Sequence, residues 1–265
     1  MPKLKRSTAV EDAARDGVEY IESLDRGLRV LELLGADRRP LTLSDVAKAA
    51  NLPRATARRI LQTLARAGYV QGDGKLFALT PRVLSLASAY LSSNQIVAVM
   101  QPMMDRVSDE TKEVGSMAIL DGEQAVFIAR SSPARVFSAG IDIGYRLPAF
   151  CTSVGRALLG RLGNDELAAT IGRMNLVPQT SLTAVDKDVV IAAIITDRRK
   201  GYSLVDREAE EGFRSIAVPV RRYDGEIVAA INVGAHIDRI SPGEMIDRFL
   251  PPLKHAAGSA KPLLM

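Results

Sequence analysis

The sequence is short of several residue types, and each shortage excludes a class of protein. Its 265 residues include one cysteine, Cys151, two histidines and no tryptophan. One cysteine cannot form a disulfide within the chain, and one thiol with two imidazoles cannot build a thiolate-rich metal site. No apolar run reaches the roughly 18 residues of a membrane-spanning helix, and the polar N-terminus lacks the apolar core of a signal peptide. These shortages predict a cytoplasmic protein with no cofactor, no metal and no membrane partner.

What remains is the composition of a globular protein with unevenly distributed charge. Hydrophobic residues make up 47% and charged residues 25% of the chain, whose length suits one large or two ordinary domains. The formal net charge is +4, but residues 48–82 contain seven basic side chains and a single acidic one, Asp73. Charge concentrated in this way attracts polyanions, although a solvated basic surface is an alternative.

The first 80 residues predict a compact helical unit that ends in a hairpin. The predicted elements are a helix over about 24–34, a second helix that ends near residue 50, a third over 53–67, and strands over 69–71 and 76–79. Ser23 is the predicted cap of the first helix and Gly35 its end, and Thr42 or Ser44 caps the second. An Asn-Leu-Pro turn precedes the third helix, and a Gly-Asp-Gly turn joins the strands. This order is typical of the winged helix-turn-helix.

The third helix is predicted to carry a DNA-binding surface. With Ala57, Ile60, Leu61 and Leu64 toward the core, the 100° step of an α-helix turns the basic and polar residues outward. Arginine can bind guanine edges bidentately, and threonine, glutamine and lysine reach base edges or phosphates. The predicted DNA-binding residues are Ser44, Arg54, Thr56, Arg58, Arg59, Gln62, Arg66 and Lys75. The alternative is a winged helix that contacts protein instead of DNA.

The rest of the chain mixes helices and strands. A helix over 81–93 ends in a break near 92–94, the predicted domain boundary. Beyond it, helices are predicted at 97–111, 154–162, 165–173, 186–200 and 242–257, and strands at 116–120, 125–130, 136–141, 202–206, 215–220 and 227–233. Strand runs separated by helix runs favour an α+β (mixed α/β) fold with a mainly antiparallel sheet. The helix over 81–93 is more apolar than one small domain needs, so we expect it to pair with a second copy of itself.

Several segments resemble the IclR family of bacterial transcription regulators. They are SLDRGLRVL at 23–31, LTP at 79–81, LPAFCTSVGRALL at 147–159, GY at 201–202, SIAVPV at 215–220, AINVG at 230–234 and FLPPL at 249–253. The residues of these segments are similar to those of the family branch that controls aromatic-acid breakdown through protocatechuate and 4-hydroxybenzoate. The resemblance implies dimers, or dimers of dimers, on palindromic double-stranded DNA operators. It implies a small aromatic acid or pathway intermediate as effector, and no enzymatic activity.

The resemblance also implies four parts in the chain. They are a flexible tail (1–19), a winged helix-turn-helix DNA-binding domain (20–80), a linker and dimerisation helix (81–95) and a GAF-like effector-binding domain (96–265).

The effector site is predicted at the start of the helix over 154–162. Thr152 suits the N-cap of this helix, and the free amides of Ser153 and Val154 can then bind a carboxylate. Ordinary capping without a ligand gives the same pattern. By resemblance, the family's pocket positions fall on Ala139, Leu147, Ser153, Val154, Phe213, Ser215, Asn232 and Gly234.

Strand alternation from Ala139 adds two candidates to this pocket. Phe137 is a predicted ring partner, and Arg135 is either a carboxylate partner or a surface charge at a strand end. A position that is acidic in some family members is Val205 here, with Asp206 beside it. This difference favours a more apolar ligand.

Three alternatives to an aromatic-acid regulator remain open. One is an enzyme with an accessory winged helix, in which Cys151 is the nucleophile and His236 its base, although no third orienting residue is evident. The others are a protein-interaction scaffold and a regulator of a non-aromatic pathway. Further expectations concern isolated charges: Glu208, Glu210 and Glu211 form a solvated acidic loop or an interdomain charge partner, and His255 lies on the surface of the last helix.

Overall fold

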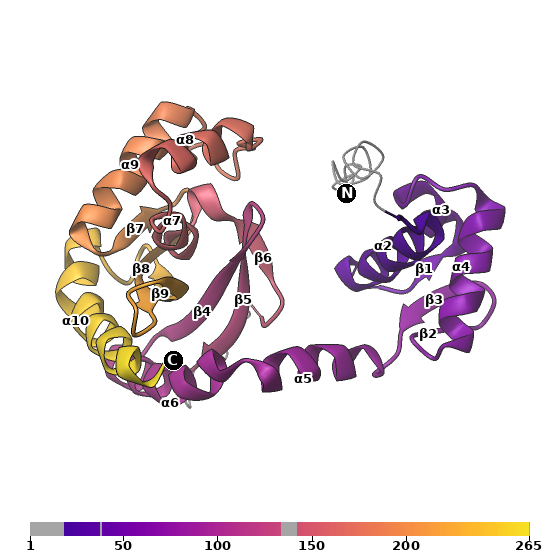
Figure 1. The fold of residues 1–265 in the computed structure, drawn as a ribbon, viewed down its shortest axis with the longest axis horizontal. Coiled ribbons are helices and arrows are strands. Elements are labelled where there is room, and N and C mark those ends of the chain that lie inside the picture. The colour runs from indigo at the N-terminus through magenta and orange to yellow at the C-terminus, as the bar shows by residue number, and fades with distance from the viewer. Residues whose placement is uncertain (1–18, 38, 134–141, 265) are drawn as a thin grey trace. The chain divides into compact units, whose positions relative to one another are not determined.

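The chain divides into two compact units that meet between Tyr90 and Leu91. The computed structural model describes residues 19–37, 39–133 and 142–264 (Figure 1). Within these ranges no single helix is long and apolar enough to cross a membrane, and only the consecutive helices over 83–93 and 95–111 pass that test, as a bent pair.

The N-terminal unit consists of helices and a small sheet. Its elements are α2 (Glu22–Ala36), β1 (Leu41–Thr42), α3 (Leu43–Ala49), α4 (Arg54–Arg66), β2 (Val70–Gly72) and β3 (Leu76–Leu79). The strands form an antiparallel sheet in the order β1-β3-β2. The predicted winged helix-turn-helix is therefore confirmed, with the two-residue strand β1 as an addition that the sequence pattern does not indicate.

Local chemistry sets the ends of α3 and α4. Thr42 and Asp45 form a capping box in which each side chain accepts the other's backbone amide, so Thr42 rather than Ser44 caps α3. Asn51 adopts a left-handed φ of 53°, which asparagine tolerates better than most residues. Pro53, expected as the first helical residue, lies one position earlier, at the N-cap of α4.

Two expectations for α2 are wrong. Ser23 lies inside its first turn, since the N-cap is Ile21, and the helix continues past Gly35 to Ala36. Leu24 and Leu28 are 58% and 53% exposed. The helix buries Val30, Leu33 and Leu34, because only its later turns reach the core around α4.

The C-terminal unit is built on one six-stranded sheet. The helix α5 (Val83–Ser93) leads to it, followed by α6 (Gln95–Thr111), β4 (Val114–Asp121), β5 (Gln124–Ser131), β6 (Arg146–Pro148), the 3-10 turn η1 (Ala149–Cys151), α7 (Ser153–Leu159), α8 (Asn164–Arg173), α9 (Lys187–Lys200), β7 (Ser203–Asp206), β8 (Phe213–Arg221), β9 (Ile227–His236), α10 (Pro242–Ala260) and η2 (Lys261–Leu263). Neighbouring strands are all antiparallel, in the order β6-β5-β4-β9-β8-β7. The mixed α/β fold and antiparallel sheet are confirmed. The predicted strand at 136–141 lies outside the described residues. The strand β6 was not predicted from the sequence.

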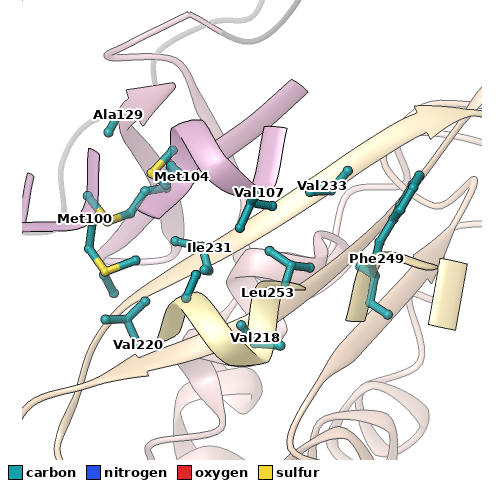
Figure 2. Close-up of a cluster of buried hydrophobic side chains, with 14 of the residues drawn as sticks. Met100, Met104, Val107, Ala129, Val218, Val220, Ile231, Val233, Phe249 and Leu253 are labelled. Carbon is teal, nitrogen blue, oxygen red and sulfur yellow. The ribbon is translucent and has the colours of Figure 1, made fainter. Parts of the chain in front are cut away.

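One face of the sheet packs against α6 and α10. Val218, Ile231 and Val233 contact this helical layer in a hydrophobic cluster that includes Met104 of α6 and Leu253 of α10 (Figure 2). Side chains alternate between the two faces of a strand, so the residues between these positions face the other way.

The opposite face packs against α7. Ala118, Ala217 and Ala230 lie on this face with Val154 and Leu158 of α7. The small alanines leave room for a helix close to the sheet. Polar residues that share this face are therefore buried between α7 and the strands.

Candidate functional site

The outward face of α4 is an exposed basic surface. Ala57 and Leu61 are buried in the core with Ile60 and Leu64 packed around them, as the helical periodicity predicts. Every predicted DNA-binding residue is exposed except Thr56, which is half-buried. Among the described residues, no ion pair involves any of the five basic side chains of this set: Arg54, Arg58, Arg59, Arg66 and Lys75. Their charge is therefore available to a polyanion.

The hairpin beside α4 is held in a fixed shape. The carboxylate of Asp73 accepts the backbone amides of Lys75 and Leu76, each at 2.8 Å, and these bonds hold the pKa of Asp73 below its usual range. Gly72 has no room for a side chain, since a Cβ there would lie 2.7 Å from the ring of Phe77. The hairpin therefore presents Lys75 from a rigid turn.

The start of α4 adds a second anion-binding feature. No side chain caps this 13-residue helix. Its first amides therefore stay free to meet a phosphate at the positive end of the helix dipole, next to Arg54. A helix of this kind can enter the major groove while its first turn holds the backbone.

The predicted effector-site helix begins as expected. Thr152 is the N-cap of α7, and its hydroxyl accepts the amide of Gly155 at 3.2 Å and donates to the carbonyl of Pro148 at 3.2 Å. The only proton of this hydroxyl is thus used within the protein. Gly155 is required here because a Cβ would lie 2.2 Å from the carbonyl oxygen of Ala149.

Two serine hydroxyls meet at the end of α7. Ser153 Oγ lies 2.7 Å from Ser215 Oγ of β8, and Ser153 is almost fully buried. Each hydroxyl carries one proton, so their mutual bond uses one and leaves the other for a ligand oxygen. Beside them the ring of Phe213 lies against Gly234, where a Cβ would be 2.4 Å from a ring carbon. The structure thus brings together four of the pocket positions that the resemblance implied.

A row of polar residues crosses the sheet on the same face. Asn232 of β9 pairs with Ser116 of β4, which in turn pairs with Arg130 of β5. The Oδ1 atom of Asn232 is buried and has no hydrogen-bond partner within the part of the chain that the structure describes. A buried acceptor without a donor costs free energy, which makes it a position for a ligand's donor. The guanidinium of Arg130 donates to Asp142 at 3.1 Å.

Ser116 and Arg130 were not among the site residues predicted from the sequence. Both lie in predicted strands, and Ser116 alternates with the inward-facing Ala118, which was a usable signal. The pairing of Arg130 with Ser116 lies beyond an irregularity of the β4–β5 register at Met117 and Ala118, which a strand pattern does not reveal.

The remaining predicted pocket residues have different positions. Arg135, Phe137 and Ala139 lie outside the described residues. Leu147 is half-buried on β6, and Val154 is buried with Leu158. Val205 is buried and pairs with Ser215, so its apolar side chain takes a place beside the serine pair.

Nearby charges are paired inside the protein. The carboxylate of Asp206 accepts a hydrogen bond of 3.0 Å from the Nε atom of Arg214. Glu208, expected in a solvated acidic loop, is instead largely buried, and its carboxylate forms an ion pair of 2.7 Å with Arg156 of α7. That expectation is wrong for Glu208, because its partner lies far away in the sequence, whereas Glu210 and Glu211 are exposed.

Cys151 does not have the properties of a nucleophile. Burial raises the pKa of its thiol to about 12, and the charge of Glu208 adds to the effect. The thiol is therefore protonated at neutral pH, whereas a nucleophilic cysteine needs its thiolate. His236 is exposed and lies 3.2 Å from the carboxylate of Asp238, and His255 is exposed on α10 as expected.

Comparison with known proteins agrees with this architecture. Residues 23–74 match the IclR helix-turn-helix domain, and residues 88–260 match the bacterial transcriptional regulator IclR C-terminal family. The chain is 40% identical to the Pca regulon regulatory protein of Pseudomonas putida, over 90% of this chain and 82% of that protein. It is 35% identical to the p-hydroxybenzoate hydroxylase transcriptional activator of Acinetobacter baylyi, over 93% of both chains. An IclR homolog from Microbacterium hydrocarbonoxydans, solved in complex with 4-hydroxybenzoate, has a TM-score of 0.74 at 25% identity, covering 91% of this chain and 98% of that one.

Proposed function

Because this chain belongs to the IclR family of bacterial transcription regulators, and is thus a DNA-binding regulator, we propose that α4 and the β2–β3 hairpin bind its operator and that a hydroxylated aromatic acid controls this binding. The observation that carries the ligand half of the proposal is the unpartnered, buried Oδ1 atom of Asn232 on the face that α7 covers.

The DNA half of the proposal rests on the exposed basic surface of α4. We infer that Arg58 and Arg59 bind base edges and that Arg54 and Lys75 bind phosphates from the helix start and the hairpin, because all four side chains are exposed. Non-specific attraction then comes from the unpaired charges, and sequence preference from the few side chains that touch bases.

The ligand half combines three kinds of contact. The spare proton of the Ser153–Ser215 pair, together with the first amides of α7, binds the carboxylate of the acid. The ring lies against Phe213, and a hydroxyl group of the ligand donates to Asn232. Two relatives support a hydroxylated aromatic acid as the ligand. One is named as the p-hydroxybenzoate hydroxylase transcriptional activator, and the other was solved in complex with 4-hydroxybenzoate.

We further propose that the regulator is a dimer paired through α5. No residue of this helix is buried, and Leu84 and Leu86 are 65% and 54% exposed. An apolar surface of this kind is stabilised by a second copy, and a symmetric pair places two recognition helices about one DNA turn apart on a palindrome.

The proposed ligand contact is tested by removing the hydroxyl group from the ligand and the amide group from the protein, each alone and both together. Isothermal titration calorimetry with 4-hydroxybenzoate and with benzoate is carried out on the wild type and on Asn232→Leu, which keeps the branched shape of the side chain and removes its hydrogen-bonding atoms. The wild type should favour 4-hydroxybenzoate by about tenfold, the worth of one hydrogen bond in a buried site, and the variant should not distinguish the two acids.

Two results contradict the proposal in different ways. If both proteins prefer 4-hydroxybenzoate to benzoate equally, Asn232 does not bind the hydroxyl group of the ligand. Tight binding of a non-aromatic acid by the wild type, with no binding of either benzoate, replaces the aromatic effector by another class.

A further inference from the structure

Arg156 and Glu208 form a buried ion pair behind the effector site. Their Nη2 and Oε2 atoms are 2.7 Å apart, and only 6% and 15% of the two side chains are exposed. Desolvation of two charges costs about as much as their attraction returns, so a buried pair adds little to net stability. What such a pair does provide is a fixed distance and direction between the elements that carry it.

The two elements joined by this pair also build the pocket. Arg156 lies one turn after Ser153 on α7, and its Nε atom donates to the carbonyl of Phe150 at 2.8 Å, which fixes the guanidinium at both ends. Glu208 lies in the segment that leads into β8, ahead of Phe213 and Ser215.

The segment that carries Glu208 is held from several sides. The carboxylate of Glu208 accepts the amide of Ala184 at 3.2 Å, and its carbonyl accepts the hydroxyl of Thr183 at 2.6 Å. The preceding residue, Arg207, is kept at a φ of 63°, and Thr180 donates to its carbonyl at 2.7 Å. A non-glycine residue takes this backbone conformation only when its surroundings impose it.

Helix α7 is therefore tied to the β8 segment at two places, the serine pair in the pocket and the ion pair behind it. A carboxylate that accepts a hydrogen bond from the spare hydroxyl proton leaves the bond between the serines in place, so the geometry of this contact depends on how α7 is held against β8. The second tie, between Arg156 and Glu208, uses none of the serine atoms that would contact the ligand.

We propose that Arg156 and Glu208 are positioning residues of the effector site, which hold α7 against the β8 segment so that Ser153 and Ser215 stay aligned when a ligand binds beside them. The inference rests on the proposed ligand site, but the alignment itself can be tested without ligand.

The test separates positioning from stability. Glu208→Gln and Arg156→Met each leave one buried charge without its partner and should lower the melting temperature. The double variant Arg156→Met/Glu208→Leu removes both charges and should recover most of that loss. A structural role alone predicts that the double variant also recovers 4-hydroxybenzoate affinity. A positioning role predicts that its affinity stays lower by about tenfold or more, the effect of one lost charge-assisted hydrogen bond.

A ligand-free measurement uses Cys151, the only cysteine of the chain, which is buried directly before the cap of α7. Its rate of reaction with a thiol reagent reports how often this helix start opens. We expect the rate to rise by about tenfold or more in the double variant, which removes both the charge of Glu208 that raises the pKa of the Cys151 thiol and the charge of Arg156 that lowers it. The matched control is Glu226→Gln, which removes an exposed partner of Arg222 and should leave the rate unchanged.

The outcomes distinguish this inference from the proposed function. A double variant with wild-type affinity and a wild-type labelling rate overturns the positioning role. If the double variant does not fold, Glu208→Gln with both quantities unchanged overturns it equally. Absence of aromatic-acid binding in the wild type contradicts the proposed ligand, while faster Cys151 labelling in the double variant still supports the role of the pair in holding α7.

Discussion

The two candidate sites of this regulator, one in each unit, hold their charged side chains in opposite ways. On α4, Arg54, Arg58 and Arg59 extend into water. In the C-terminal unit, Arg156 and Glu208 are withdrawn from water and joined by directional hydrogen bonds. An exposed charge acts through a field that changes slowly with distance but is screened by salt, whereas a buried pair depends on geometry and is screened little. The first arrangement suits a long polyanion, and the second suits a small ligand of fixed shape.

The largest expected effect tests the exposed charges. Arg54→Ala/Arg58→Ala/Arg59→Ala should reduce operator affinity by about 100-fold or more, because each phosphate or base contact contributes roughly 1–3 kcal/mol. The salt dependence should also become shallower, by about 0.9 in log–log slope for each lost phosphate contact. Fluorescence anisotropy with operator DNA over a salt series measures both quantities.

The control for this triple variant removes the same net charge elsewhere. Arg161, Arg173 and Arg199 are exposed in the C-terminal unit, and their combined replacement by alanine should leave operator affinity nearly unchanged. Equal losses in the two triple variants would show that net charge, and not the α4 surface, controls DNA binding.

The next effect tests the buried geometry. Ser153→Leu fills the space beside Ser215 and should weaken effector binding by about tenfold or more, because a bulky side chain in a packed site displaces its neighbours. Calorimetry with 4-hydroxybenzoate measures the loss, and operator affinity without ligand serves as the control. Ser153→Ala, which keeps the space and the amides, should cause a smaller loss. Wild-type effector binding in Ser153→Leu would place the ligand elsewhere.

The contrast between the units also explains what the sequence could predict. Each residue of a helix has its direction fixed by its neighbours, so the exposed face of α4 follows from Ala57 and Leu61 alone. The cap at Thr152 and the left-handed Asn51 are likewise local features. These elements therefore follow from the residues themselves.

The buried network of the C-terminal unit depends on pairings between distant segments. Glu208 in an acidic run resembles a solvated residue until Arg156, 52 positions away, is seen beside it. The row from Asn232 to Ser116 requires the β4–β9 register, which no local pattern contains. The resemblance supplied Asn232 and Ser215, but only the fold adds Ser116.

A smaller effect concerns the helix that joins the units. Leu84→Asp/Leu86→Asp places charge on two sides of the exposed apolar helix α5 and should shift the chain from dimer to monomer at micromolar concentration. Operator affinity should then fall because a monomer contacts one half-site only. Light scattering measures the mass, and Leu24→Asp/Leu28→Asp on the exposed side of α2 is the matched control. A dimer that persists in the α5 variant would place the interface elsewhere.

The smallest effect is a difference in pH dependence between two carboxylates. Backbone amides from Leu76 and Lys75 lower the pKa of Asp73 in the hairpin, whereas burial raises the pKa of Asp197 on α9 despite a hydrogen bond from Ser203. A lowered pKa means that Asp73 stabilises the fold above its unfolded pKa and that this contribution is lost as the pH falls through its folded pKa. A raised pKa means that Asp197 favours the fold most at acidic pH and that this contribution is lost as the pH rises through its folded pKa. Calorimetric melting of the full chain at pH 4 and pH 7 should therefore show opposite trends: Asp73→Asn is more harmful at the higher pH, and Asp197→Asn is less harmful there. The same trend in both variants would mean that the hairpin and α9 do not hold these two carboxylates differently.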